Sequence, residues 1–588
     1  MTNIRSTNGL SLLYQGIQLF SSEPQHISGH RKEMVQQIER ETFRLLEEPI
    51  PELDMETFEL FKRTGSRREY EQLYFARRKR LTALGLMVMI HPNEERYLQH
   101  LCSIIEAVCD EYTWCLPAHY ANERSIDLFA AETAFTLAEL NELIGERLPE
   151  GLRQRIKREV LDRVLEPFLA EEFIWWEKAE HNWASVCAGS VGAAALYCIK
   201  EEGDRLERII QRAEQAMYCY LDGFEEDGAC KEGYSYWQYG FGYFIYFVDL
   251  LRAHRNGQSS LLAAEKVKQI ALFQQKCFLS GKAVVNFSDS LPEVGVYMGL
   301  THYLNAEYDE VHIPEDHVAA EFHEDHCGRW APAVRNLLWT TDRIGAPWPN
   351  ESYKMEQAQW FVSRAEVAGS CAAFAAKGGH NDEPHNHNDL GHFILAMNGH
   401  SLLVDAGSGM YTRDYFGEKR YEYVCASSAG HSVPIIDGKL QSPSLQNKAM
   451  LLQCETHKDV DTMMLDLKQA YACDYLSYFT RSFNWNKKEG KLTLYDEFQG
   501  NTEDAIAVIE RFIVAHKPEA LEPNRLIIAN NAVSVVIGYD SSQLAWETEA
   551  FEYMDHFGKP TILHRLDFRP MAPSTKQLLS FSFELQQV

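Results

Sequence analysis

The spacing of apolar residues changes near residue 345, and this change constrains the fold more than any other feature of the chain. Before it, apolar side chains recur every three or four residues, as in 151–170, which is typical of amphipathic helices. After it, short apolar runs alternate with turn residues, which indicates antiparallel strands. A stretch with Pro and Gly, 344–350, separates the two patterns. We predict an all-α toroid of helical hairpins over residues 1–345 and an antiparallel β-sandwich over residues 350–588.

Helical periodicity recurs in several segments, and prolines and glycines fall mostly between them: 34–46, 97–109, 126–148, 151–170, 184–200, 206–221 and 260–278. In the second half, Asn398-Gly399 lies between two apolar runs. This pair predicts a tight hairpin, because both central residues of such a turn take positive φ. A second hairpin is expected over 482–495, and the stretch 578–585 alternates as a strand does.

Charge and cysteine content restrict the class of protein. The formal charge is −28, from 57 basic and 85 acidic residues, which argues against a nucleic acid as the main partner. Thirteen cysteines without a CxxC pair indicate free thiols in a reducing compartment. Residues 1–20 lack a clean signal peptide, and the longest apolar stretch, 186–199, is too short to cross a bilayer. We expect a cytoplasmic protein without a membrane partner, and self-association stays open.

The first of three polar clusters is HNHND (385–389), which leads into the Asn-Gly hairpin and is followed by Asp405 and, further on, by His431. Two histidines and an aspartate are ligands that zinc accepts. The hairpin brings His387 and Asp405 toward one end of the sheet. Because its register sets Asp405 opposite His392, His392 is a rival ligand. The alternative is that these histidines cap strands and satisfy loop backbone.

Two more clusters lie in the helical half. Glu180-His181-Asn182-Trp183 precedes the segment 184–200, where His and Asn can bind a ligand carboxylate or Asn182 can cap the helix. The stretch 227–240 enters a helix rich in tyrosines. A tyrosine can act as an acid or base when positive neighbours lower its pKa. The alternative for this stretch is an aromatic layer between helices.

Taken together, HNHND, the hairpin with its following DAG, and the later GHS…DG (430–438) resemble the heparinase II/III-like family of polysaccharide lyases. The upstream HNW and EGYSYWQYG segments are similar to the helical domain of that family. The resemblance spans roughly residues 90 to 440 and is specific in 381–438. It implies an (α/α) toroid followed by an antiparallel β region. It also implies β-elimination on an oligo- or polysaccharide that contains uronic acid.

The resemblance assigns roles that the chemistry requires. Elimination removes the C5 proton of a uronate, so the sugar carboxylate must be neutralised, a base must take the proton and an acid must protonate the leaving O4. Asn182 is the expected neutraliser, assisted by His181. Tyr236 is the expected acid and base, with Tyr239 as the fallback one turn away, and His385 is a base or stabiliser from the β region. The remaining expected residues are Trp183, Glu232 and Arg413 for substrate binding, and His387, Asp405 and His431 for a structural zinc.

The negative charge of the chain requires local cations for an anionic sugar, and the candidates are Arg77, Arg78, Arg413, Lys419 and Arg420. The charge also favours short oligosaccharides over long, highly sulfated polymers. Two other functions stay open. A glycoside hydrolase would use a pair of carboxylates such as Asp222, Asp227 or Glu232. A zinc-stapled carbohydrate-binding protein would keep the fold without turnover.

Overall fold

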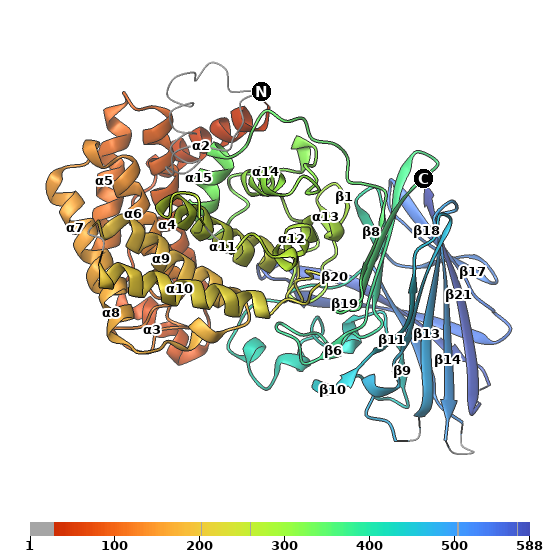
Figure 1. The fold of residues 1–588 in the computed structure, drawn as a ribbon. Coiled ribbons are helices and arrows are strands. Elements are labelled where there is room, and N and C mark those ends of the chain that lie inside the picture. The colour runs from red at the N-terminus through yellow and green to blue at the C-terminus, as the bar shows by residue number, and fades with distance from the viewer. Residues whose placement is uncertain (1–28, 201–202, 259, 475, 502–504, 573) are drawn as a thin grey trace. The chain divides into compact units, whose positions relative to one another are not determined.

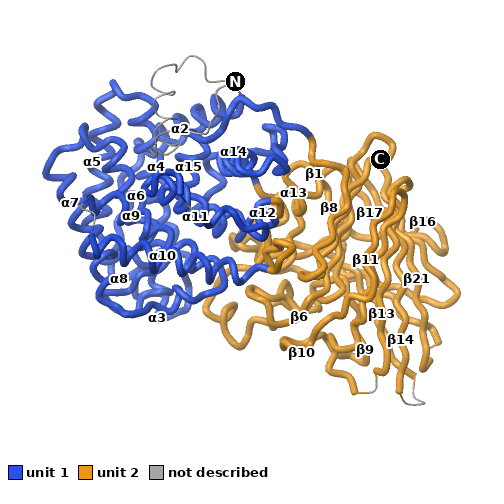
Figure 2. Tube along the Cα trace, viewed as in Figure 1, with its two compact units in different colours: residues 1–224, 236–271, 295–346 blue, residues 225–235, 272–294, 347–588 orange. Residues whose placement is uncertain are grey.

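The protein is described by a computed structural model that covers residues 29–588 except 201–202, 259, 475, 502–504 and 573. The predicted absence of a signal peptide in 1–20 lies outside the described residues. The chain forms two compact units (Figure 2), which we call the helical unit and the sheet unit. The helical unit contains the chain up to Phe224, then Tyr236–Ala271 and Gly295–Ala346. The sheet unit contains Glu225–Ser235, Leu272–Val294 and Pro347–Val588.

The division between Ala346 and Pro347 lies inside the stretch 344–350. However, 225–235 and 272–294 fold with the sheet unit, which the two-domain prediction did not anticipate. The local spacing of apolar residues does not predict this placement, because contacts between residues far apart in the sequence decide it. Within the sheet unit, for example, the Asn286 side-chain amide donates to the backbone carbonyl of Asp405 at 3.1 Å.

A helical N-terminal half followed by antiparallel sheets is the predicted fold class, and it is confirmed (Figure 1). The closure of the helices into a toroid stays a prediction. The α-helices are α2 His30–Leu46, α3 Met55–Thr64, α4 Arg68–Ile90, α5 Glu95–Cys109, α6 Leu128–Leu143, α7 Glu150–Val160, α8 Glu166–Ala170, α9 Gly189–Cys198, α10 Asp204–Asp222, α11 Tyr234–His254, α12 Glu265–Ala271, α13 Phe273–Cys277, α14 Met298–Glu307 and α15 Trp330–Leu338.

Helix ends follow ordinary capping chemistry, whereas three predicted helices are interrupted. One of them, 260–278, contains two separate helices, α12 and α13, and ends in strand β1 (Phe278–Ser280). The Asp127 carboxylate accepts a hydrogen bond from the Ala130 N–H at 2.8 Å and begins α6. The predicted helix 151–170 contains a π-helical turn, η3 Leu161–Leu165, just before Pro167. Proline lacks the N–H that a continuous α-helix requires, and the wider turn accommodates this loss. The predicted helix 184–200 likewise opens with a π-helical turn, η5 Ala184–Ala188.

The sheet unit contains a sandwich of two large antiparallel sheets. In spatial order, one sheet contains β19 Leu544–Met554, β20 Pro560–Pro570, β15 Val508–Val514, β8 His400–Leu403, β7 Phe393–Met397, β5 Ser370–Lys377, β4 Trp360–Val367 and β3 Ser352–Met355. The other contains β11 Met450–Glu455, β12 Val460–Asp466, β13 Leu476–Asn486, β14 Lys491–Gly500, β21 Lys576–Gln587, β18 Val533–Gly538, β17 Arg525–Ala529 and β16 Glu519–Glu522. Short pairings join β1 Phe278–Ser280 to β2 Ala283–Val284, β6 His380–Asn381 to β10 Ser444–Lys448, and β9 Ile435–Ile436 to β15.

The predicted hairpins are confirmed. Asn398 and Gly399 have φ of 50° and 81°, as a tight turn between β7 and β8 requires. Phenylalanines from the two sheets meet in the core, where the ring centroids of Phe374 and Phe483 lie 5.4 Å apart. The spacing of strand residues thus buries one face of each sheet against the other.

One buried charge cluster fixes loops of the sheet unit. Arg481 on β13 is fully buried and pairs with Asp496 at 2.7 Å and Glu510 at 2.5 Å. Its Nη1 group also donates to the backbone carbonyls of Gly391 and Ser432. Because these carbonyls adjoin His392 and His431, Arg481 holds both histidine-bearing loops on the sandwich.

The thirteen cysteines all lie in the described chain, and they are free thiols. Nine of them are buried. No helix in the described part of the chain is both long enough and apolar enough to cross a bilayer.

Candidate functional site

Asn182 lies in the helical unit between the 3₁₀ turn η4 Trp175–Lys178 and the π-helical turn η5. The residue preceding η5 is Trp183, and no side chain caps the turn, so Asn182 is not the helix cap that was the alternative. Asn182 is only 3% exposed. Its side-chain amide makes no hydrogen bond to the described residues and is not one of the fully buried unpaired polar groups, so it keeps access to solvent and can donate to a ligand.

The N-terminal part of α11 lies against Asn182. A Cβ added at Gly240 would lie 3.0 Å from the Asn182 Cβ and 2.9 Å from the Tyr220 hydroxyl. Tyr236 precedes Gly240 by four residues, so the two share one face of the helix. The half-buried Tyr236 side chain therefore projects from the helix face that carries the Asn182 contact.

Tyr239 lies in a separate network. Its hydroxyl donates to the Glu132 carboxylate, which also accepts from the Tyr243 hydroxyl at 2.8 Å. The Arg329 guanidinium lies 4.2 Å from the centroid of the Tyr239 ring and 3.3 Å from Glu132. Burial, together with the charge of Glu132, holds the pKa of Tyr239 well above its usual value. The phenol of Tyr239 is thus tied to Glu132 and is poorly suited to losing its proton.

Aromatic side chains gather next to Asn182. The Trp183 ring lies 4.9 Å from the Trp175 ring and 4.9 Å from the His119 ring, measured between centroids. His181, which is half-buried, lies 6.3 Å from Trp175. Trp175 is 56% exposed although it is large and apolar. Such a surface suits the apolar face of a sugar ring.

In the sheet unit, His385 is held by a carboxylate that the sequence analysis did not identify. Its Nδ1 lies 2.6 Å from Oδ2 of Asp289, and its Nε2 lies 3.6 Å from Oε2 of Glu232. His385 has a φ of 56°, a conformation that side-chain-bearing residues rarely adopt, and Ser288 next to Asp289 has a φ of 62°. Strain of this kind collects at functional sites.

Asp289 accepts three more hydrogen bonds. The donors are Nε2 of His387 at 3.0 Å, the Tyr415 hydroxyl at 2.5 Å and Nη2 of Arg420 at 3.0 Å. Burial alone would raise the pKa of Asp289, but the two histidine hydrogen bonds and the charge of Arg420 hold it well below its usual range. No local motif marks Asp289, since Ser288-Asp289-Ser290 is unremarkable in sequence.

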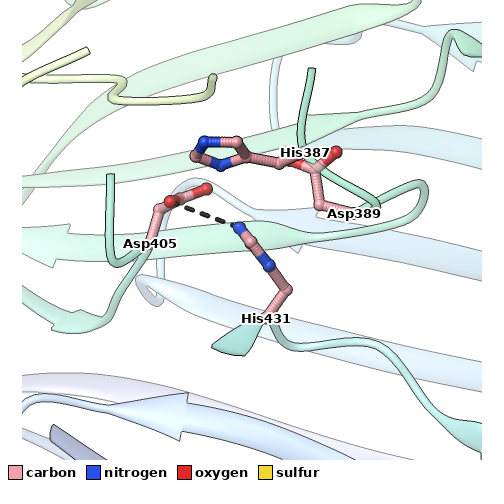
Figure 3. A group of neighbouring side chains, drawn as sticks. All are labelled: His387, Asp389, Asp405 and His431. Carbon is pink, nitrogen blue, oxygen red and sulfur yellow. Dashed lines mark ion pairs between the residues drawn. The ribbon is translucent and has the colours of Figure 1, made fainter. Parts of the chain in front are cut away.

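The three expected metal ligands do come together, with one addition. His387, Asp389, Asp405 and His431 each offer a ligand atom, and these atoms lie within 4.8 Å of one another (Figure 3). All four residues are buried. We call them the metal group. Asp389 belongs to the HNHND motif, although it was not predicted as a ligand, and it also pairs with the buried Lys377 at 2.8 Å.

The hydrogen bonds that His387 and His431 make away from the metal group determine which of their ring nitrogens carries the proton. His431 donates from Nδ1 to the Ser427 carbonyl at 2.9 Å, so its Nε2 faces Asp405 with a lone pair, 3.5 Å from Oδ1. His387 donates from Nε2 to Asp289, so its Nδ1 carries a lone pair. Neither of these nitrogens has a hydrogen-bond partner among the described residues. Two bare nitrogens that face carboxylates fit a cation, and outer hydrogen bonds of this kind are usual for metal-ligating histidines.

His392, the alternative candidate ligand, has a different role from His387 and His431. Its Nδ1 accepts the Ser432 N–H at 2.9 Å, so its proton lies on Nε2, which is 3.3 Å from Oδ2 of Asp405. Burial lowers the pKa of His392 to about 3. A neutral ring whose Nε2–H faces Asp405 orients that carboxylate and does not itself present a lone pair to a metal.

Most of the expected substrate cations are engaged elsewhere. Arg77 and Arg78 are buried and share the Glu111 carboxylate at 2.8 and 2.7 Å. Arg420 is buried on Asp289. These three expectations were wrong, because each guanidinium neutralises a buried acid. The other two lie at the surface of the sheet unit, where Lys419 pairs with Asp414 at 3.3 Å and Arg413 is exposed.

The carboxylates proposed for hydrolysis are differently placed. Both oxygens of Asp227 accept hydrogen bonds from backbone amides, from Ala229 at one oxygen and from Gln357 and Ala358 at the other. A carboxylate held by these backbone amides stabilises the loops that contain them. Asp222 is exposed at the end of α10. Glu232 is buried close to His385, in the same unit.

Comparison with known proteins agrees with this organisation. Residues 349–582 match the family described as Heparinase II/III-like, C-terminal. No curated protein sequence matches the chain. A crystal structure of heparinase III superposes with a TM-score of 0.63 at 15% identity, covering 88% of this chain and 77% of the other. Heparan sulfate lyase HepC from Pedobacter heparinus superposes with a TM-score of 0.60 at 14% identity, covering 100% and 92%.

The motif-based resemblance is thus confirmed by two independent comparisons. The family match covers the sheet unit after the division at Pro347, including the HNHND motif and the metal group. The structural matches extend over the helical unit as well. The C-terminal domain of this chain thus matches the Heparinase II/III-like, C-terminal family, and the chain shares its fold with the solved heparinase III and heparan sulfate lyase structures.

Proposed function

We propose that the protein is a carbon–oxygen lyase that cleaves uronic-acid-containing oligo- or polysaccharides by β-elimination and releases 4,5-unsaturated uronate products. The similar solved structures, a heparinase and a heparan sulfate lyase, support a glycosaminoglycan as the substrate class. The observation that carries the proposal is the Asp289–His385 pair. A carboxylate that holds Nδ1 presents the second ring nitrogen, Nε2, as an acid–base group.

The residues divide the chemistry as follows. The Asn182 amide donates a hydrogen bond to the uronate carboxylate, where negative charge develops once the C5 proton leaves. Such a donor typically contributes about 3–4 kcal/mol to the transition state. His385 accepts the C5 proton at Nε2, and the Tyr236 phenol supplies a proton to the leaving O4. Tyr236 suits this role better than Tyr239, whose hydroxyl is held by Glu132.

The proposed substrate subsite contains several aromatic side chains and few charged ones. Trp183 and the exposed Trp175 offer stacking surface beside Asn182, and His181 adds a polar edge. In the sheet unit, Glu232 and Arg413 complete the proposed contacts. Because three of the five candidate cations are neutralised internally, we propose a short, sparsely sulfated oligosaccharide as the preferred substrate. The free cysteines support a cytoplasmic location, where such fragments would be degraded.

We also propose that the metal group holds zinc through His387, Asp405 and His431, with Asp389 as a fourth ligand. Bound zinc would supply a structural cross-link between the HNHND segment, the end of the hairpin and the 427–432 loop. In this role the metal stays away from the sugar, and the protein side chains perform the elimination.

A panel of uronate glycans tests the proposal. Glycosaminoglycans and alginate, each as polymer and as tetrasaccharide, are incubated with the protein, and near-ultraviolet absorbance reports the conjugated double bond that elimination creates. We expect absorbance with at least one glycan and faster turnover of the tetrasaccharide. New reducing ends without absorbance would indicate a hydrolase. Binding without any product would indicate a carbohydrate-binding protein. Faster cleavage of sulfated polymers would overturn the size and charge preference.

A further inference from the structure

The segment 286–289 connects two parts of the sheet unit that otherwise have separate tasks. Asp289 contacts His385, the proposed base, and His387, a member of the metal group, through different carboxylate oxygens. Three residues earlier, Asn286 donates to the backbone carbonyl of Asp405, another member of that group. One short segment therefore touches both the base and two metal-group residues.

The contacts of Asp289 also determine which ring nitrogens of His385 and His387 carry a proton. Asp289 is buried, and each of its four partners within the described residues can donate: two imidazoles, one phenol and one guanidinium. Each imidazole must therefore direct an N–H at Asp289. This leaves Nδ1 of His387 bare toward the metal group and Nε2 of His385 as the proton-accepting nitrogen. Since Arg420 balances the charge of Asp289, both rings can remain neutral.

Arg420 reinforces this geometry. Besides Asp289, it donates from Nε to the carbonyl of Asn386 at 3.0 Å, and Asn386 is the residue between the two histidines. The spacing of the two rings is therefore fixed from the backbone as well as from their N–H groups. A change at either ring is transmitted to the other through a rigid, fully paired carboxylate.

We propose that Asp289 is a positioning residue that couples the metal group to the base: it sets the tautomers of His387 and His385 together, so that loss of the metal disorders the base and loss of Asp289 releases the metal. This inference rests on the proposed function for the role of His385. The part of the inference that concerns metal retention does not depend on the proposed function, because it involves only the residues of the metal group and Asp289.

The test is Asp289→Asn, which keeps the size of the side chain but offers an amide where donors require acceptors. The matched control is Asp461→Asn. Asp461 is also a buried acid of the sheet unit with four donors, Ser352, Ser363, Lys487 and the His457 N–H. Zinc per chain is measured by elemental analysis after a graded chelator challenge. The kcat and KM of elimination are measured on the best glycan.

We expect Asp289→Asn to lose zinc at about 10–100-fold lower chelator concentration than wild type. We also expect kcat to fall at least 10-fold, with KM within about threefold, since Asp289 does not touch the sugar. Asp461→Asn should keep both values while it lowers thermal stability. Removing zinc should lower kcat in wild type but not further in Asp289→Asn, because coupled changes are not additive.

Zinc retention equal to that of Asp461→Asn would overturn the inference, as would additive effects of zinc removal and Asp289→Asn. If Asp289→Asn does not fold, wild type alone decides: zinc removal must lower kcat at least 10-fold and added zinc must restore it, and an unchanged kcat overturns the coupling. If no glycan is cleaved, the proposed function fails, while the zinc-retention comparison still tests the contact between Asp289 and the metal group.

Discussion

The backbone of Gly240 on α11 packs directly against the side chain of Asn182, where a methyl group at residue 240 would lie 3.0 Å from the Asn182 Cβ. This contact sets the distance between the helix that carries Tyr236 and the amide proposed to neutralise the substrate. The contact tolerates no side chain without a shift, since real Cβ contacts are rarely so short.

We predict that Gly240→Ala lowers kcat about 10-fold, because small displacements of positioned groups are costly in catalysis. Thermal stability should change little, since alanine's helix preference of about 1 kcal/mol over glycine offsets part of the clash. The control is Gly242→Ala, whose Cβ would have its nearest contacts with Tyr246 of the same helix. Elimination kinetics and melting curves check both variants. Equal kcat in the two would contradict the role of this contact.

Tyr236→Phe should reduce kcat by about 10²–10⁴-fold with little change in KM, because it removes a general acid but almost no contact area. Tyr243→Phe on the same helix is the control, since it loses a hydrogen bond to Glu132 and leaves Tyr236 in place. Product absorbance measures turnover, and circular dichroism confirms folding. A folded Tyr236→Phe with near-wild-type kcat would exclude the phenol from the reaction.

The metal group predicts about one zinc per chain. His431→Ala should lose the metal and melt at a lower temperature, because binding free energy of a structural zinc is also folding free energy. His392→Ala removes only the ring that orients Asp405, so it should weaken zinc binding about 10–100-fold without abolishing it. Elemental analysis and calorimetry compare the two. A zinc-free wild type with unchanged melting in His431→Ala would refute the site.

An aromatic subsite beside Asn182 predicts a defect in binding and not in chemistry. Trp175→Ala should raise KM about fivefold at nearly constant kcat, which corresponds to about 1 kcal/mol of lost stacking. Tyr218→Ala, at an exposed tyrosine (44%) on α10, is the control and should leave KM unchanged. If Trp175→Ala behaves as Tyr218→Ala does, the sugar does not stack there.

Stability should depend on Asp249 in a defined pH range. Burial raises the pKa of Asp249 to about 6, and Arg335 and Arg252 offset only part of this effect. The usual value of an unfolded aspartate is about 3.9. Since the folded pKa is the higher one, the stabilising contribution is complete below about pH 4 and is lost as pH rises through 6. The loss amounts to about 3 kcal/mol.

Asp249→Asn should abolish this loss. Its free energy of unfolding, measured in urea, should gain on wild type between pH 4 and pH 7 and then stay level. Asp204→Asn, at an exposed position of α10, is the control for the effect of the substitution itself. A constant difference between Asp249→Asn and wild type across this range would show that Asp249 does not titrate as described.

Much of this protein could be derived from its sequence. Three-to-four-residue periodicity predicted helices such as α2, α5 and α10, because one face of each must be buried. The positive φ required by Asn398 and Gly399 predicted a hairpin, and that hairpin carries Asp405 to the metal group. These are local rules, in which a few neighbouring residues decide the conformation.

Only the tertiary structure revealed the partners. Asp289 and Glu232 belong by sequence to the helical half, yet they fold into the sheet unit beside His385. Arg420 resembles a surface cation in sequence, although it is buried as the counter-charge of Asp289. Residues more than ninety positions apart meet here because burial of charge requires a partner, and no local pattern records which partner it will be.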